Sequence, residues 1–394
     1  MGSVFRSAFR FLASNGLAVV LLLLLMLLTF LGTLQQVNEG LYQVQERYFG
    51  SLYVVHWVGG AIPVPLPGAY LLMVLAFVNL GCGGVIRVRK GWRHIGILIA
   101  HVGILLLLAG SFFAYHYAVR GHVTLYEGEQ SDRFQSYEDW ELVVTGPSQT
   151  GEMGSLIIPG TEFQRMTGNR SRTFYSASLP FEIDLSGYAA NATVTPAAQD
   201  QPGEAKAVDG SCLKILPPAM EAEQNMPGAY VAVKEKASGT QHEHILSAAK
   251  DPVSFAVDNK TWTIALEHRS WPLPFTIMLD KFTRELHPGT SIPKVFMSEV
   301  TKMEGDSRQR IQISMNEPLR HKGYTLYQAS WGPSNAGPHD RLFSTFAVVK
   351  NPAESLPLYS CSIIGLGLLI HFALKLFAYL RQQSKLQQQS KTRS

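Results

Sequence analysis

Four long apolar runs constrain the fold of this chain more than any other feature of its sequence. They cover residues 17–34, 70–86, 95–116 and 356–380, and each is long enough to cross a hydrocarbon core of about 30 Å as a helix. Residues 117–355 carry most of the charge and contain no comparable run. Composition alone would not show this, since 46% hydrophobic and 16% charged residues also describe many soluble proteins. We therefore predict four transmembrane α-helices and one large polar domain.

The placement of Lys and Arg favours one orientation. Segments 1–16, 87–94 and 381–394 contain basic residues and no Asp or Glu. Cytoplasmic flanks carry such an excess, so we expect these three segments in the cytoplasm, and the loop 35–69 and the domain 117–355 outside. We expect the first run to stay as a span rather than be cleaved as a signal peptide, because no clear Ala-x-Ala site follows it.

Two histidines lie inside the apolar runs, His101 in the third and His371 in the fourth. Lipid cannot satisfy imidazole nitrogens, so a histidine at membrane depth indicates a partner: a metal, haem iron or a neighbouring polar group. With antiparallel helices, both rings are expected on the order of 10 Å from the cytoplasmic face, which permits a shared site. We take both as candidate cofactor-binding residues and His101 as a candidate metal ligand. The alternative for each is a hydrogen bond that only fixes helix packing.

The polar domain is expected to be β-rich. Short clusters of β-formers alternate with turn residues, a spacing typical of one or two antiparallel lobes that are sandwich-like or barrel-like. Residues 195–224, rich in Ala, Pro, Gly and acids, are expected to form a surface excursion. The predicted strands are residues 122–126, 140–145, 181–185, 230–234, 261–266, 275–282, 311–315, 324–330 and 343–349.

The same domain lacks the residue patterns of a catalytic centre. It has no Gly-x-Ser-x-Gly, phosphate loop or His-Glu-x-x-His, and the His-Glu-His segment 242–244 is expected to be a solvated loop rather than a metal site. Cys82, Cys212 and Cys361 form no Cys-x-x-Cys pair, so the chain cannot itself run a thioredoxin-like dithiol relay. No basic stripe interleaved with aromatic residues indicates nucleic-acid binding. We predict no catalytic residue and a role in binding and positioning.

Several segments together resemble one known family. WRHIGILIAHVG, residues 92–103, opens the third run, and MNEPLRHKGYTLYQASW, residues 315–331, lies near the end of the polar domain. Further segments of this kind are residues 30–35, 65–71, 275–282 and 293–298. The chain resembles the ResB family, also called CcsB, of system II cytochrome c biogenesis.

The resemblance implies a role in attaching haem to apocytochromes c outside a bacterial inner membrane. In that family a ResB-type protein pairs with a CcsA-type membrane protein, and the pair moves haem outward and joins its vinyl groups to the Cys-x-x-Cys-His thiols of the apocytochrome. His101 matches the family's intramembrane histidine, which implies transient binding of haem b shared with the partner. The implied partners are a CcsA-type protein, apocytochrome c and a thioredoxin-like thiol reductant, with the large domain on the periplasmic side.

The chain also departs from a complete haem-attachment enzyme. The tryptophan-rich motif of the CcsA partner is absent, because the six Trp residues are scattered singly. We therefore expect a non-catalytic or co-catalytic subunit of a holocytochrome c synthase, or haem lyase. Two alternatives stay open: a membrane-anchored assembly factor or chaperone for apocytochrome that does not contact haem, and a b-type haem electron-transfer subunit in which His101 and His371 are the two axial ligands.

Overall fold

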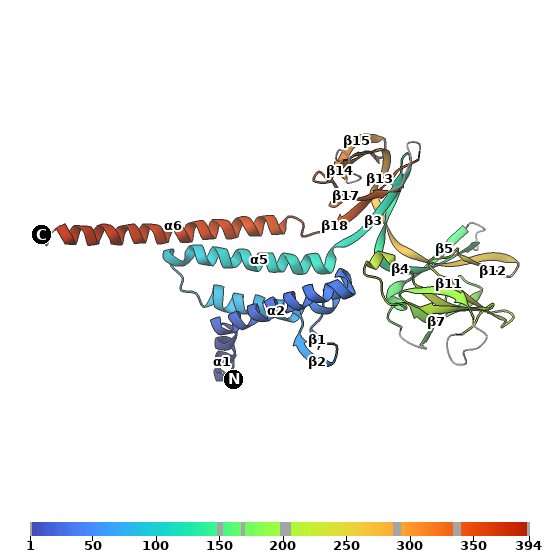
Figure 1. The fold of residues 1–394 in the computed structure, drawn as a ribbon, viewed down its shortest axis with the longest axis horizontal. Coiled ribbons are helices and arrows are strands. Elements are labelled where there is room, and N and C mark those ends of the chain that lie inside the picture. The colour runs from blue at the N-terminus through green and yellow to red at the C-terminus, as the bar shows by residue number, and fades with distance from the viewer. Residues whose placement is uncertain are drawn as a thin grey trace. The chain divides into compact units, whose positions relative to one another are not determined.

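The computed structural model describes residues 2–147, 153–166, 170–197, 206–286, 293–333 and 340–391. The chain divides into two compact units (Figure 1). The helical unit consists of Met1–Val119 and Lys350–Ser394, and the β unit is Arg120–Val349.

The helical unit contains the four predicted spans. Helices of sufficient length and apolarity to cross a membrane cover Asn15–Glu39, Ala69–Ile86, Trp92–Tyr117 and Leu356–Gln389, which confirms four spans. The last helix does not end with the apolar run at residue 380 but continues through the polar tail. The elements are α1 (Gly2–Leu12), α2 (Asn15–Glu39), α3 (Leu41–Val44), the π-helix η1 (Gln45–Phe49), β1 (Tyr53–Val58), β2 (Ile62–Pro67), α4 (Ala69–Asn79), the π-helix η2 (Leu80–Ile86), the 3₁₀ turn η3 (Trp92–His94), α5 (Ile95–Tyr117) and α6 (Leu356–Lys391).

Local sequence signals explain where the first long helix begins and ends. Ser14 is its N-cap, because the Ser14 hydroxyl accepts a hydrogen bond from the Leu17 amide at 3.1 Å. Gly40, with φ of 82°, ends α2 in a conformation that favours glycine. The chain then turns into α3, η1 and the hairpin β1–β2, whose antiparallel register pairs Tyr53 with Pro67 and Val58 with Ile62. The predicted loop 35–69 therefore consists of the end of α2, the short helices α3 and η1, and the hairpin β1–β2.

Helices α5 and α6 pack with their backbones in close approach. A Cβ atom at Gly96 of α5 would lie 2.5 Å from the backbone nitrogen of His371, and one at Gly367 of α6 would lie 2.5 Å from the backbone nitrogen of Ala100. Small residues at such crossings are typical of helix pairs in membranes, where dispersion contacts rather than the hydrophobic effect hold helices together. The packing therefore fixes the register of α6 along α5.

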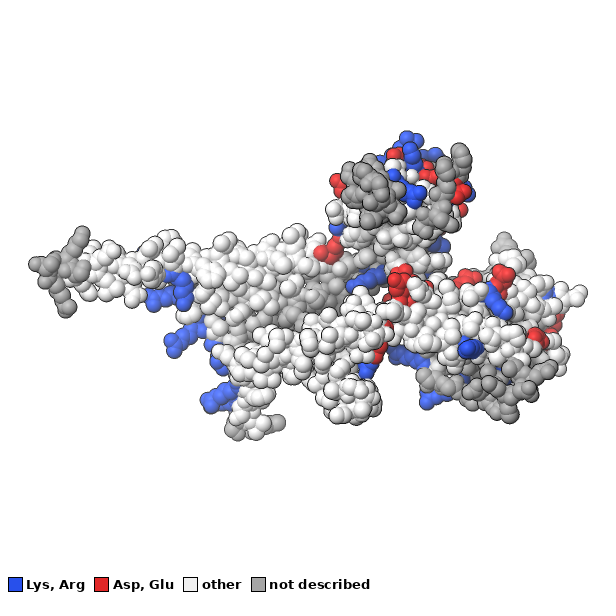
Figure 2. Space-filling model, viewed as in Figure 1, with Lys and Arg blue, Asp and Glu red and all other residues white. Residues whose placement is uncertain are grey.

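The charge distribution of the helical unit matches the expected flanks. In Figure 2 Lys and Arg gather at one end of the unit, without Asp or Glu beside them on the face drawn, and the helices between carry almost no charge. By the positive-inside rule, this end is the side predicted to be cytoplasmic.

The β unit has two lobes that share the long strands β4 and β13. A ten-stranded sheet among the described residues runs in the order β15-β14-β13-β4-β3-β18-β17-β16, with β12 added to β13 and β5 added to β4, and part of it curls into a nearly closed barrel. A four-stranded sheet runs in the order β11-β10-β7-β6. The strands are β3 (Val119–Tyr126), β4 (Gln130–Pro147), β5 (Met153–Pro159), β6 (Ser171–Phe174), β7 (Phe181–Ala189), β8 (Ala192–Pro196), β9 (Ser211–Ile215), β10 (Gly228–Glu235), β11 (Gln241–Ser247), β12 (Val253–Val257), β13 (Lys260–Leu286), β14 (Pro293–Glu304), β15 (Ser307–Ser314), β16 (Leu319–His321), β17 (Tyr324–Gly332) and β18 (Phe343–Lys350).

Each lobe has its own apolar core, built from the alternate residues of its strands. The four-stranded sheet packs on β4 and β13 of the large sheet, and we call this part the sandwich lobe and the curled part the barrel lobe. In the sandwich lobe, Ile183 of β7 and Val233 of β10 pack in one cluster with Leu142 of β4 and Ile264 of β13, all fully buried. In the barrel lobe, the buried side chains include Ile277, Leu279, Val300, Ile313, Leu326 and Phe346. The expectation of sandwich-like or barrel-like lobes is therefore confirmed in both forms.

All nine predicted strand segments fall on strands, with residue 315 just past the end of β15, but the expectation of a loop at residues 242–244 is wrong. Segment 242–244 lies in β11, where His244 pairs with Val231 and stacks on Phe255. The period of two places His244 on the same face of β11 as the buried Leu246. The described part of residues 195–224 includes the hairpin β8–β9, and Leu213 is buried against Tyr230. Its Ala- and Pro-rich composition hid this pairing.

Candidate functional site

His101 lies on α5, half-buried, and uses one ring nitrogen to bind the adjacent helix. Its Nδ1 is 2.7 Å from the backbone oxygen of Gly84 in η2. A carbonyl oxygen can only accept, so Nδ1 carries the proton and donates it. In the neutral imidazole the other nitrogen, Nε2, then keeps its lone pair, which is the tautomer that a metal or haem iron binds.

The π-helical geometry of η2 explains why this carbonyl is available. In a π-helix a carbonyl bonds to the amide five residues later, and η2 ends at Ile86. The Gly84 oxygen therefore has no amide partner within the helix, and the His101 ring satisfies it. Residue 84 must also be small, because a Cβ atom there would lie 2.8 Å from Nδ1 of His101 and 2.7 Å from Cδ1 of Leu80.

The structure does not place His371 opposite His101. The His371 backbone packs against Gly96, five residues before His101 and so about 7.5 Å away along the helix axis. Gly96 and Ala100 face α6, whereas His101 faces Gly84 of η2. The equal depth expected from counting residues does not hold, because packing of the small residues sets the register of α6. This geometry does not favour one haem held between these two histidines of a single chain.

His371 nevertheless has an unusual nitrogen of its own. Its Nδ1 is buried and finds no hydrogen-bond partner among the residues that the structure describes. Buried polar atoms are nearly always paired, so His371 stays a candidate for contact with a ligand or a partner helix.

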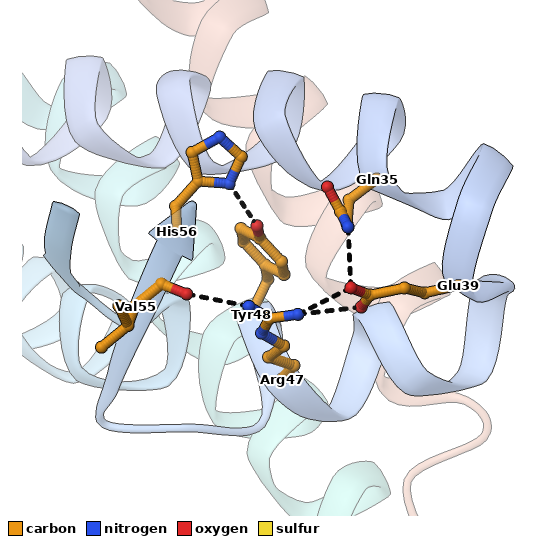
Figure 3. Close-up of polar contacts among 6 residues, drawn as sticks. All are labelled: Gln35, Glu39, Arg47, Tyr48, Val55 and His56. Atoms are coloured by element: carbon orange, nitrogen blue, oxygen red, sulfur yellow. Dashed lines mark hydrogen bonds and ion pairs between the residues drawn. The ribbon is translucent and has the colours of Figure 1, made fainter. Parts of the chain in front are cut away.

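A polar network, which sequence analysis did not predict, orders the loop between the first two spans (Figure 3). Arg47 of η1 contacts both carboxylate oxygens of Glu39 at 2.8 and 3.0 Å and donates to the Val55 oxygen of β1 at 2.9 Å. The Tyr48 hydroxyl lies 2.6 Å from Nδ1 of His56. Burial raises the pKa of Tyr48, against a lowering by Arg47, so the hydroxyl stays protonated. These contacts tie α2, η1 and the hairpin β1–β2 together.

Described residues of the helical unit line two pockets, and charged side chains contribute to each. A pocket of about 500 Å³ in the loop 35–69 is lined by Gln35, Asn38, Glu39, Arg47, His56, Trp57 and Gly60. A second pocket of about 340 Å³, which we call the basic pocket, is lined by Arg89, Lys90, Gly91, Trp92, His94, Ile95 and Leu98. The basic pocket combines cations with apolar side chains, and its last lining residue, Leu98, is less than one helical turn before His101. Its chemistry suits an amphipathic anion.

In the β unit, residues of segments 293–298 and 315–331, which carry the resemblance to the ResB family, have structural roles. Ser298, Gln328 and Ser344 form a closed buried ring: the Ser298 hydroxyl is 2.7 Å from Oε1 of Gln328, Nε2 of Gln328 donates to Oγ of Ser344 at 2.7 Å, and the two serine oxygens are 2.9 Å apart. His321 donates from Nε2 to Glu304 at 2.8 Å, and Lys322 binds the same carboxylate. These contacts hold strands of the barrel lobe together.

The described residues of the chain contain no group of three or more His, Cys, Asp or Glu side chains arranged to hold a metal. The three cysteines are free, and Cys212 lies beside Thr195 rather than another thiol. The sequence analysis predicts that the chain has no catalytic residue, and this stays a prediction.

Comparison with known proteins agrees with the motif resemblance. Residues 248–341, which include β12 to β17, match the model of the ResB-like family. A protein of Microcystis aeruginosa (strain NIES-843 / IAM M-2473) named cytochrome c biogenesis protein CcsB is 34% identical over 115 residues, which is 29% of this chain and 24% of that protein. A protein of the same name from Synechococcus sp. (strain RCC307) is 31% identical over 91 residues, or 23% of this chain and 19% of that protein.

The matches thus span about a quarter or less of the length of these relatives. The family match lies within the β unit, on strands of both lobes, and does not include His101, whose assignment depends on its own motif and geometry. Over this part of its length, and with four apolar helices beside a large β unit, the chain is similar to the ResB-like family, and its resemblance to the CcsB proteins of cytochrome c biogenesis is confirmed.

Proposed function

We propose that this chain is the ResB-like subunit of a system II haem-attachment complex in the bacterial inner membrane. With a CcsA-type partner, it holds haem within the membrane while haem is exported and joined to apocytochrome c on the periplasmic side. The observation that carries this proposal is the tautomer of His101, because donation from Nδ1 to the Gly84 oxygen leaves Nε2 free for iron.

The residues around His101 fit a haem group. Apolar side chains of α4 and α5 suit the porphyrin faces, and the Arg and Lys side chains of the basic pocket suit the two propionates. When bound, haem would supply the iron and the reactive vinyl groups. The chain would supply an oriented imidazole, a cationic end and exclusion of water.

A second axial ligand would come from the partner. His371 is displaced along the membrane normal from His101, so within this site the chain offers one well-placed imidazole. This is the arrangement expected of a shared, transient haem rather than of a resident electron-transfer haem. The β unit, anchored by α5 and α6, would position apocytochrome c or a thioredoxin-like reductant, since its described residues provide no thiol pair.

The proposal is tested in the purified complex with the CcsA-type partner. We expect His101→Gly to insert normally and to lose most of the copurified haem and of cytochrome c maturation, with partial recovery on addition of imidazole. Val102→Gly is the matched control, because it introduces glycine at the next position of the same helix at a side chain that is 45% exposed. Equal haem content in His101→Gly and Val102→Gly would contradict the proposal and favour an assembly factor that does not contact haem.

A further inference from the structure

A second pair of histidines lies in the β unit and is unassigned by the family resemblance. His122 is on β3 and His268 is on β13, the two strands that flank β4 in the large sheet. Their ring centroids are 6.2 Å apart, and the ring planes are nearly perpendicular at 84°. The sheet order therefore brings together two imidazoles from distant segments.

Both histidines have a buried nitrogen without a partner. Nδ1 of His122 and Nδ1 of His268 are each inaccessible to solvent and find no hydrogen-bond partner among the described residues. Buried imidazole nitrogens are ordinarily paired with a carbonyl, a hydroxyl or water. Two such atoms on neighbouring rings are therefore better explained by a common ligand than by two independent packing defects.

Aromatic side chains hold both rings in place. Tyr137 stacks on His122 with ring centroids 4.8 Å apart, and Trp140 packs on His268 with ring centroids 3.7 Å apart. Tyr137 and Trp140 both belong to β4, the strand between the two histidines. The pair is thus preorganised, because neither ring can turn away without losing its aromatic contact.

The electrostatic surroundings keep the lone pairs available. Burial lowers the pKa of His122, and burial together with the neighbouring His122 lowers the pKa of His268 to about 4. Burial and the carboxylate of Glu223 raise the pKa of Tyr137 to about 12, so its hydroxyl is neutral. At neutral pH both imidazoles are therefore uncharged, and each can offer one nitrogen to a cation.

We propose that His122 and His268 bind a single monovalent copper ion between their Nδ1 atoms. Imidazole nitrogen is a preferred ligand of copper and zinc. With metal–nitrogen distances of about 2 Å, ring centroids would be roughly 6 Å apart when the two nitrogens lie on opposite sides of the ion, and roughly 5 Å apart at a tetrahedral angle. The observed 6.2 Å is close to the spacing expected for a wide nitrogen–metal–nitrogen angle, which is the geometry that two-coordinate Cu(I) adopts.

The test titrates the full-length protein in detergent with Cu(I) under anaerobic conditions, in competition with a chromogenic Cu(I) chelator. We expect one ion per chain that is bound at least tenfold more weakly in His122→Ala and in His268→Ala. His242→Ala is the matched control, because this imidazole is about half exposed on β11 and outside the pair, and its removal should change nothing. Equal stoichiometry and affinity in the wild type and in the double variant His122→Ala/His268→Ala would overturn the proposal.

A spectroscopic measurement on the wild type keeps the proposal testable if the variants fold poorly. X-ray absorption of the one-to-one Cu(I) protein should show two nitrogen neighbours at about 2 Å and no sulfur. Binding should also quench the fluorescence of Trp140, which packs directly on His268. Sulfur in the first coordination shell would place the ion at a Cys or Met side chain and refute the histidine site, and so would tighter binding of Zn(II) than of Cu(I) at the pair.

Discussion

At the scale of single residues, the account depends on how His101 divides its two nitrogens. One binds a backbone oxygen that the end of a π-helix leaves free, and the other is left for a ligand. The sequence was sufficient to single out His101, because an ionisable side chain in an apolar run is costly without a partner. It did not predict Gly84, the Arg47–Glu39 pair or the His122–His268 pair, because these contacts join residues across turns and sheets whose geometry no local pattern records.

The role of Gly84 can be separated from that of its helix. In Gly84→Ala the new methyl group must displace the His101 ring, so the hydrogen bond, worth on the order of 1 kcal/mol, is weakened and Nε2 is misoriented. We expect a severalfold lower haem content in the purified complex. Gly81→Ala, in the same π-helix with no atom within 4 Å of the added Cβ, should keep the wild-type content. Equal haem content in the two variants would remove Gly84 from the site.

At the scale of elements, the nine predicted clusters of β-formers fall on eight strands, two of them on β13. Among the strands that were missed, β8, β9 and β11 carry polar or Ala-rich residues at their exposed positions. The four spans followed directly from apolar run length, but the depth of His371 did not. That depth is set by the crossing of α5 and α6, which depends on where small residues allow two backbones to meet.

The α5–α6 crossing gives a prediction at this scale. Gly367→Val forces a branched side chain against the backbone of Ala100 and should destabilise the helical unit by about 1–3 kcal/mol. Thermal denaturation in detergent measures the effect as a lower midpoint. Gly365→Val, two residues earlier on α6 with no atom within 4 Å of its added Cβ, should leave the midpoint nearly unchanged. A similar midpoint for both variants would mean that the crossing does not determine stability.

At the scale of the whole molecule, the chain combines a helical unit with four spans and a two-lobed β unit. The chain enters the β unit after α5 and leaves it before α6. Sequence patterning predicted this division, since charge and apolar runs segregate along the chain. It left sandwich and barrel as alternatives, because strand periodicity records which face is buried and not which strands pair. The structure contains both.

The orientation is a prediction at the same scale. The basic end of the helical unit should be cytoplasmic and the β unit periplasmic. A reporter enzyme that is active only in the periplasm should be active when inserted at Gly239, in the turn between β10 and β11, and inactive when inserted at Lys90. The reverse pattern of activities would invert the topology and exclude periplasmic haem attachment by this chain.

The central claim is that His101 contacts haem iron, and exchanging the ligand tests it most directly. In the complex with the CcsA-type partner, His101→Cys offers iron a thiolate in place of imidazole, and Val102→Cys offers the same group one position along the helix. The account predicts that bound haem in His101→Cys acquires the absorption and EPR features of thiolate ligation, while Val102→Cys keeps the wild-type spectrum. Unchanged haem content and an unchanged spectrum in His101→Cys would contradict it.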